Sequence, residues 1–307
     1  MPEEEVAPYT PVRAPRSLNV ELRGVDTHVL RWGNERSAKL FLLHGWMDVA
    51  ASFQFLVDAL HGEFQVIAPD LRGFGRTAWQ PQGYAFADYV ADVDALLARF
   101  APGERVCLCG HSLGANVVMH YAGVRPERVE SLIALDGFGL PGESPERAPK
   151  KLAAWLDSLD VPPSFAPYAS FAAVAQRLRK NDPRLSSDKA AFLARHWAAQ
   201  GADGHVRLTS DPRHKRPFPT VYRLEETFAV WRRIEARALW IAAEASHIAA
   251  WIDDRAEPEK VADPLGGIRT RMSHLRDARL VTIADAGHML HHDQPEAVAR
   301  AIEAFLA

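Results

Sequence analysis

A serine stands between two glycines in the segment Gly110 to Gly114, whose sequence is Gly-His-Ser-Leu-Gly. An apolar run, Val106 to Cys109, precedes this segment, and a helical pattern, Leu113 to Val124, follows it. Glycine on both sides allows a sharp turn, and a serine in strained backbone geometry at a helix N-terminus lifts its hydroxyl above the sheet. A chance match in a glycine turn lacks this setting, so the pattern predicts Ser112 as a nucleophile.

The elements that position this serine follow an alternating pattern of strands and helices. Short apolar runs are typical of buried parallel strands, and the segments between them carry apolar residues at helical spacing. Such alternation indicates an α/β fold with a parallel sheet covered on both faces. The predicted strands are Leu18 to Leu22, Thr27 to Trp32, Lys39 to Leu43, Gln65 to Ala68, Arg105 to Cys109 and Ser131 to Leu135, with helices at Phe86 to Phe100 and Leu113 to Val124.

The alternating pattern breaks after Asp136, where helical patterns, prolines and many aromatic residues follow without clear strands. The strand pattern resumes at Ala238 to Ala243 and Arg279 to Ile283, and a last helix at Pro295 to Leu306 has its proline in the first turn. We therefore expect an inserted helical cap at 140–237, a catalytic core formed by 17–139 and 238–307, and a flexible, proline-rich and acidic arm at 1–16.

Taken together, these motifs resemble the α/β-hydrolase family from Leu18 to Leu306. The resemblance implies a mostly parallel central sheet flanked by helices, with an inserted cap. The segment His44-Gly45-Trp46 is similar to the oxyanion segment of the family, which assigns the oxyanion hole to the backbone N–H groups of Trp46 and Leu113. Each such donor contributes about 3 kcal/mol to transition-state stabilisation. His44 itself is expected to brace the loop.

A serine hydroxyl needs a general base because it is almost entirely protonated near neutral pH. Among 13 histidines, His288 follows a predicted strand at the position where the family places its catalytic histidine. The neighbouring His291 and His292 are expected at the surface or at a helix start, and His111 is expected to be structural.

The acid of the site has two candidates. The position where the family usually has its aspartate, after Ala238 to Ala243, carries Ser246, and a neutral serine cannot stabilise an imidazolium. Asp136 follows the strand Ser131 to Leu135, from which some family members draw their acid, including haloalkane-dehalogenase-like hydrolases. Glu244 lies two residues before the vacant position. We favour Asp136 and keep Glu244 as the alternative.

A second turn, Asp70 to Thr77, also resembles a family motif. Its expected role is structural, with Asp70 and Arg72 tying the turn together by hydrogen bonds and an ion pair. The charged run from Ser210 to Arg216 is expected to be a solvated loop rather than a clamp for a carboxylate.

Charge and composition narrow the classes of partner and location. The net charge is −3 with both signs interspersed, which disfavours nucleic acid and membrane surfaces as partners. The acidic start lacks the pattern of a signal peptide, and no apolar run is long enough to span a membrane, so we expect a cytosolic protein. Cys107 and Cys109 are expected on one face of a strand as buried thiols, without a disulfide or metal site.

The resemblance also implies an activity. The phrase Leu43 to Asp48, the long cap and the missing aspartate after Ala243 are most similar to serine-hydrolase-like proteins related to haloalkane dehalogenases. A serine nucleophile suits acyl transfer, which implies hydrolysis of small to medium carboxylic esters, a small-molecule substrate, and no metal or organic cofactor. Hydrolysis of lactones, thioesters, amides or carbon–carbon bonds remains open, as does a ligand-binding protein that retains the pocket. The oligomeric state is left open.

Overall fold

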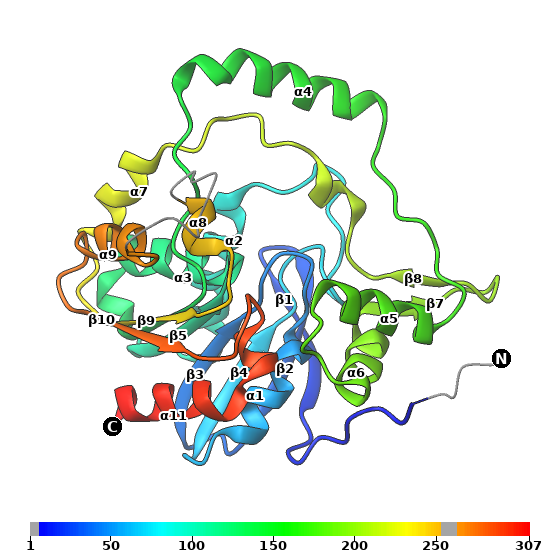
Figure 1. Cartoon of the computed structure of the whole chain (residues 1–307), viewed down its shortest axis with the longest axis horizontal. Helices are drawn as coiled ribbons and strands as arrows, with labels where there is room; N and C mark the ends of the chain where they lie inside the picture. The colour runs from blue at the N-terminus through cyan, green and yellow to red at the C-terminus, as the bar shows by residue number, and fades with distance from the viewer. Residues whose placement is uncertain (1–5, 253–262) are drawn as a thin grey trace.

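The computed structural model describes residues 6–252 and 263–307, so parts of the predicted arm and core, 1–5 and 253–262, lie outside the described residues. An eight-stranded sheet in the order β1-β2-β4-β3-β5-β6-β9-β10 forms the centre of the molecule (Figure 1). Its strands are β1 (Arg16–Leu22), β2 (Val25–Trp32), β3 (Ala38–Leu43), β4 (Phe64–Pro69), β5 (Val106–His111), β6 (Val129–Leu135), β9 (Arg237–Ala243) and β10 (Ala278–Ile283).

The strands β4, β3, β5, β6, β9 and β10 pair in parallel. At one edge of the sheet, β1 pairs with β2 and β2 pairs with β4 in antiparallel fashion. Each of the eight predicted strands is present, and the predicted α/β class with a mostly parallel sheet is confirmed. The side chains of β3 to β6 and β9 are almost all buried, because helices cover both faces of the sheet.

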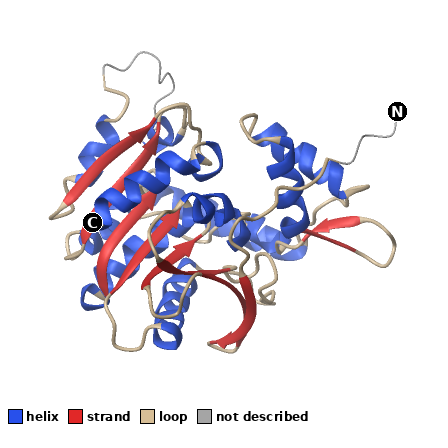
Figure 2. Ribbon diagram, turned by 90° about the horizontal axis from the view of Figure 1, so that it is seen from below, coloured by secondary structure: helices blue, strands red, loops and turns tan. Residues whose placement is uncertain are grey.

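Two groups of helices pack on opposite faces of the sheet (Figure 2). One apolar cluster contains side chains of α1 (Gln54–Ala59) and α11 (Pro295–Leu306), and the other contains side chains of α2 (Phe86–Phe100) and α3 (Leu113–Val124). Cys109 is buried in the first cluster with Cys107 packed against it, and both are free thiols, as predicted. The remaining core helices are short: η1 (Ala50–Phe53), η2 (Pro126–Arg128), α8 (Ile248–Ile252), α9 (Gly266–Met272) and α10 (Leu290–Asp293).

The segment between β6 and β9 is mainly helical, as expected. It contains η3 (Pro145–Arg147), α4 (Ala148–Asp160), α5 (Phe171–Asn181), α6 (Ser187–Trp197), η4 (Pro212–Lys215) and α7 (Leu224–Trp231). It also contains a small antiparallel hairpin that the sequence did not predict, β7 (Ala198–Gln200) with β8 (Val206–Leu208). These strands have three residues each, too few for a recognisable alternating pattern.

Helix α7 packs on the core rather than with the other inserted helices. A Cβ at Gly123 of α3 would lie 2.2 Å from the carbonyl oxygen of Val230, and Trp231 is fully buried in the core cluster that contains α2 and α3. The predicted cap range, 140–237, therefore includes a helix that belongs to the wall of the core. Helix α4, in contrast, spans the top of the molecule in Figure 1 and has no buried residue.

Part of the predicted arm is hydrogen-bonded to the core. The Tyr9 hydroxyl donates to Asp58 at 2.9 Å, and the backbone N–H groups of Val12 and Arg13 donate to the same carboxylate. Arg16 already belongs to β1. The tail before β1 is thus anchored at α1 along residues 9–13.

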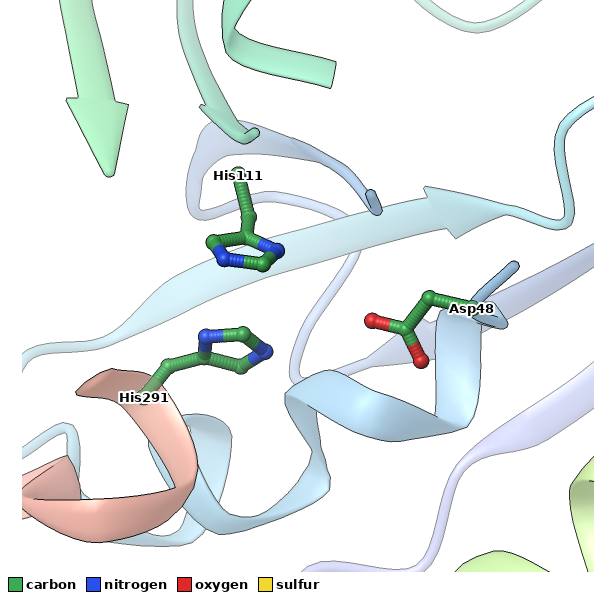
Figure 3. Close-up of side chains that lie close together, drawn as sticks. All are labelled: Asp48, His111 and His291. Carbon is green, nitrogen blue, oxygen red and sulfur yellow. The ribbon is translucent and has the colours of Figure 1, made fainter. Parts of the chain in front are cut away.

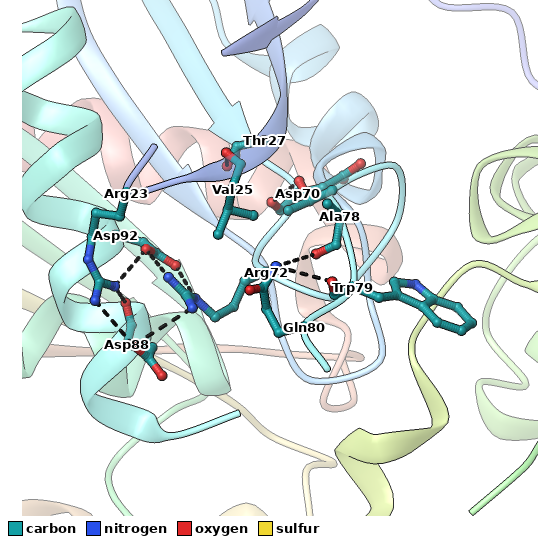
Figure 4. A network of polar contacts seen from close by, with 11 residues as sticks. Arg23, Val25, Thr27, Asp70, Arg72, Ala78, Trp79, Gln80, Asp88 and Asp92 are labelled. Atoms are coloured by element: carbon teal, nitrogen blue, oxygen red, sulfur yellow. Dashed lines mark hydrogen bonds and ion pairs between the residues drawn. The ribbon is translucent and has the colours of Figure 1, made fainter. Parts of the chain in front are cut away.

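The buried Asp70 carboxylate connects two loops at the carboxyl end of β4. It accepts hydrogen bonds from the backbone N–H groups of Ala50 at 2.7 Å and Arg76 at 2.9 Å, and from His28 Nδ1 at 2.7 Å. Arg72 uses other partners: it forms ion pairs with Asp88 and Asp92, to which Arg23 also binds (Figure 4). The expected structural role is confirmed, but the ion pair joins the turn to α2 rather than Arg72 to Asp70.

No helix among residues 6–252 and 263–307 combines the length and the hydropathy needed to cross a bilayer.

Replacing Asp70 by Asn should destabilise the protein by about 2–4 kcal/mol at pH 7, because three donors, two of them in buried hydrogen bonds, lose an ionised acceptor. Burial by itself raises the pKa of Asp70, but the hydrogen bond and charge of His28 hold it below its usual value. Because the folded pKa is depressed, the stabilisation is present above the unfolded value of about 3.9 and is lost as pH falls.

Urea unfolding of wild type and Asp70→Asn between pH 7 and pH 3.5 measures this effect. The difference in free energy of unfolding between the two proteins should narrow below about pH 4. The exposed Asp26 serves as control, and Asp26→Asn should change stability by less than about 0.5 kcal/mol. Equal effects of the two substitutions would contradict the role given to Asp70.

Candidate active site

The predicted site residues converge at the carboxyl edge of the parallel strands. Ser112 directly follows β5, Asp136 directly follows β6, and His288 lies in the loop after β10. In a parallel sheet the carboxyl ends of neighbouring strands lie together, and ligands bind in the crevice outside them. Residues that are 24 to 176 positions apart in the chain can therefore meet there.

The local sequence holds Ser112 in a backbone conformation that few residues other than glycine adopt. Ser112 has φ 51° and ψ −111° and lies at the N-terminus of α3, with its N–H donating to the Leu135 carbonyl at 3.0 Å. A Cβ at Gly110 would lie 2.2 Å from the backbone of Gly114, and one at Gly137 would lie 2.6 Å from the backbone carbonyl oxygen of Ser112. The turn therefore requires glycine at both places, and the strain presents the hydroxyl at the sheet edge.

Ser112, His288 and Asp136 form one hydrogen-bonded chain. The Ser112 Oγ lies 3.1 Å from His288 Nε2, and His288 Nδ1 lies 2.7 Å from Asp136 Oδ2. The Asp136 side chain is 2% exposed and that of His288 is 26% exposed, so the imidazole is open to the crevice while the carboxylate is not. This arrangement can take a proton from the serine and stabilise the resulting imidazolium.

Of the two candidate acids, the structure brings only Asp136 to His288. Glu244 is exposed, and its backbone N–H bonds to the Ile283 carbonyl. The Ser246 hydroxyl donates to Asp136 Oδ2, and the Ala243 N–H donates to Asp136 Oδ1 at 3.3 Å. The serine at the position where the family usually has its acid thus serves as a hydrogen-bond donor to the carboxylate of the neighbouring strand.

The predicted oxyanion segment lies against the serine turn. A Cβ at Gly45 would lie 3.3 Å from Ser112 Cβ, and one at Gly114 would lie 2.1 Å from the Leu43 carbonyl oxygen, so both glycines allow close approach. Trp46 follows at once and lines the pocket, and Leu113 opens α3. The structure thus places the segments that carry Trp46 and Leu113 side by side at Ser112.

His44 braces the predicted oxyanion segment, as expected. Its Nε2 accepts from the Leu71 N–H at 2.8 Å, so its Nδ1 carries the proton that it shares with the Gly45 carbonyl at 2.7 Å. Complete burial lowers the pKa of His44 to about 4, which keeps the ring neutral.

Other histidines near the site are buried as well. His111 Nε2 lies 2.8 Å from the carbonyl oxygen of His288 and so fixes the backbone of the candidate base. His291 and His292 lie in the first turn of α10, as the helix-start alternative predicted, but they are 0% and 3% exposed, so the surface alternative was wrong. His292 Nε2 lies 2.6 Å from Ser52 Oγ, and burial lowers the pKa of His292 to about 3. Helices η1 and α10 meet at this position and bury both rings.

Asp48, His111 and His291 converge in the interior beneath the site (Figure 3). Their ligand atoms lie within 4.8 Å of one another, and within the described chain Asp48 Oδ2, His111 Nδ1 and both nitrogens of His291 lack hydrogen-bond partners. Two ligands of one tetrahedral zinc ion lie roughly 3.3 Å apart, from bond lengths of about 2.0–2.1 Å. These side chains would have to move inward to share an ion, so we derive no metal chemistry from the cluster.

A pocket of about 900 Å³ opens beside His288. Its walls come from the loops after β3, β9 and β10 and from the inserted segment, including three aromatic residues that the sequence assigned to the cap: Phe165, Tyr168 and Trp197. The charged run Ser210 to Arg216 is not a solvated loop throughout, since Asp211 is 1% exposed and accepts from the Tyr84 hydroxyl at 2.6 Å, and Lys215 lines the pocket.

The family model of the alpha/beta hydrolase family matches residues 40–301. The chain therefore belongs to the alpha/beta hydrolase family. The match includes Ser112, Asp136 and His288, the three residues of the hydrogen-bonded chain.

Known relatives point to the same class. A serine hydrolase-like protein of Danio rerio is 26% identical over 282 residues, covering 90% of this chain and 83% of its own. A hypothetical protein of Pseudomonas aeruginosa PAO1 is 26% identical with a TM-score of 0.81 over 94% of this chain and 99% of its own. A thioesterase domain from a curacin biosynthetic pathway, at 24% identity, has a TM-score of 0.80 over 94% and 99%. The family and the serine hydrolase-like relative support hydrolase activity, whereas the two solved structures support the fold.

The buried Asp48 generates a test of the interior beneath the site. Burial raises the pKa of Asp48 to about 7, above the unfolded value of about 3.9. A raised carboxyl pKa means that the folded state binds the proton more tightly, so the contribution of Asp48 to stability falls as pH rises from about 4 through 7. Asn in place of Asp48 does not ionise and retains an oxygen for the Val49 N–H and Trp197 Nε1.

Relative to wild type, Asp48→Asn should therefore gain about 2 kcal/mol in free energy of unfolding between pH 5 and pH 8, measured by urea denaturation. The exposed Asp157 of α4 provides the control, and Asp157→Asn should show no such trend. A pH-independent difference for Asp48→Asn would refute the raised pKa.

Proposed function

We propose that this protein is a carboxylesterase that hydrolyses small to medium acyl esters through an acyl-serine intermediate. The observation that carries the proposal is the hydrogen-bonded chain from Ser112 Oγ through His288 to the buried Asp136, in a family of hydrolases. A serine hydroxyl beside an imidazole that is oriented by a carboxylate is the arrangement that acyl transfer requires.

In the first half of the reaction, Ser112 Oγ attacks the ester carbonyl carbon while His288 Nε2 takes the hydroxyl proton. The negative charge that develops on the carbonyl oxygen is stabilised by the backbone N–H groups of Trp46 and Leu113, which we propose as the oxyanion hole. The tetrahedral intermediate then collapses, the carbon–oxygen bond to the alcohol breaks, and His288 gives its proton to the leaving alcohol. The acyl group is left on Ser112.

In the second half, a water molecule attacks the acyl carbon and His288 takes its proton. The second tetrahedral intermediate releases the carboxylic acid, and Ser112 recovers a proton from His288. These steps need no metal or organic cofactor. Asp136 accepts from His288 Nδ1 throughout and stabilises the imidazolium, while Ser246 and the Ala243 N–H keep the carboxylate in place.

The inserted segment before α7 is proposed as a cap over the site. It supplies Phe165, Tyr168, Leu178 and Trp197 to the pocket, and these side chains provide an apolar surface for an acyl chain. A volume of about 900 Å³ has room for an acyl group and a modest alcohol.

The first test is hydrolysis of p-nitrophenyl esters from acetate to decanoate by wild type and Ser112→Ala. Removal of the nucleophile should lower kcat by roughly 10⁴-fold or more, because the base then has no hydroxyl to activate. The chain-length optimum measures the pocket beneath the cap.

A fluorophosphonate probe distinguishes the enzyme from a ligand-binding protein that retains the pocket. Stoichiometric labelling of Ser112 supports the esterase, whereas saturable ester binding without turnover or labelling supports the binding protein. If thioesters, lactones or amides are cleaved and the p-nitrophenyl esters are not, the assignment of Ser112 as nucleophile is retained and the substrate assignment fails.

The choice of acid makes a separate prediction. Asp136→Asn should lower kcat for the best ester by about 10³- to 10⁴-fold, because the imidazolium loses its counter-charge and its tautomer is no longer enforced. Glu244→Gln removes the same charge from an exposed position and should change kcat less than about twofold. The opposite ranking in the same assay would overturn the assignment of Asp136.

A further inference from the structure

Cationic side chains outnumber acids in the wall of the pocket beside His288. Among the described residues that line it, Arg177, Arg184 and Lys215 carry a positive charge, whereas Asp182 is the one carboxylate. Lys215 Nζ has local partners, since it donates to the Ser164 carbonyl and lies 4.1 Å from the centroid of the Phe165 ring. A wall with this excess of positive charge raises the local concentration of anionic ligands.

Arg184 is the cation next to the candidate catalytic base. It lies in the connection between α5 and α6, and a Cβ at Gly287 would lie 3.3 Å from Arg184 Nη1. The guanidinium therefore borders the backbone immediately before His288. Arg184 and Arg177 are both exposed, and within the described parts of the chain neither guanidinium forms an ion pair within 4.0 Å.

The acids near Arg184 do not cancel this charge. Asp182 and Asp293 face each other, and Asp293 Oδ2 accepts from the Gly287 N–H at 2.7 Å. Burial, and then the neighbouring Asp293 carboxylate, raise the pKa of Asp182 to about 6. Even with both carboxylates ionised, Arg177, Arg184 and Lys215 leave an excess of positive charge.

We propose that the pocket selects esters that carry a carboxylate, and that Arg184 binds this carboxylate, with Arg177 as the second cation. The planar guanidinium presents paired N–H donors that match the two oxygens of a carboxylate, and a partly enclosed pocket strengthens this interaction relative to open solvent. The inference rests on the proposed esterase function and names the substrate class of the same site. Arg184 is a specificity residue, since the bond-breaking steps belong to Ser112 and His288.

The experiment compares pairs of substrates that differ only in the carboxylate. One pair places it on the acyl side, the p-nitrophenyl monoester of adipic acid against p-nitrophenyl hexanoate. The other places it on the alcohol side, 4-carboxyphenyl butyrate against phenyl butyrate. The readout is the ratio of kcat/KM within each pair, corrected for spontaneous hydrolysis, so that effects common to both substrates cancel.

Wild type should prefer the carboxylate ester in at least one pair, and that pair identifies the side that Arg184 contacts. Arg184→Gln should lower the ratio about tenfold, mainly through KM. Arg184→Lys should restore part of the ratio, because the positive charge remains but the paired N–H donors of the guanidinium are lost. The preference of wild type should also weaken between 50 and 500 mM salt. Lys180→Gln is the matched control, because it removes an exposed cation of α5 that does not line the pocket, and its ratio should equal that of wild type.

Failure of this inference is distinguishable from failure of the esterase proposal. If wild type hydrolyses neutral esters and shows no preference for the carboxylate in either pair, or if Arg184→Gln and Lys180→Gln leave the same ratio, the inference is overturned and the esterase stands. If no ester of either pair is hydrolysed, the proposed function fails first.

Discussion

The buried carboxylate of Asp136 is the constraint on which the arrangement of the site depends. A buried charge must be hydrogen-bonded or paired, and Asp136 meets this requirement through the Ala243 N–H, the Ser246 hydroxyl and His288. These partners come from the end of β9 and from the loop after β10, so one side chain connects three parallel strands of the sheet. The position of the imidazole over Ser112 follows from this connection.

The neutral interior beneath the site supports the same geometry. Burial lowers the pKa of His44, His111 and His291, so these rings remain uncharged and do not compete with His288 for protons. His111 holds the backbone of His288 through its carbonyl oxygen, and His44 holds the segment before Trp46. The proposed catalytic groups therefore rest on buried, hydrogen-bonded side chains, and such fixed surroundings favour preorganised catalysis.

The long segment inserted between β6 and β9 forms a part of the molecule that is distinct from the strand ends. The strand ends supply the proposed nucleophile, base and acid, whereas α5, α6 and the loops around them supply most of the pocket wall. Arg184 lies where these two parts of the molecule meet, next to Gly287. Changes in the inserted segment can therefore alter the substrate without disturbing the hydrogen-bonded chain.

Local patterns in the sequence were sufficient to predict the eight strands and the main core helices, and to single out the serine turn and His288 as candidates. Buried parallel strands are short apolar runs, and the glycines around Ser112 are required by backbone sterics at that turn, so both leave a local signal. Only the tertiary structure shows that Asp136, and not Glu244, contacts His288, that Ser246 donates to Asp136, that His291 and His292 are buried, and that α7 packs on α3. The same holds for the place of Arg184 in the pocket. Each of these depends on contacts between residues far apart in the chain, and such contacts leave no periodicity or spacing that a single sequence can display.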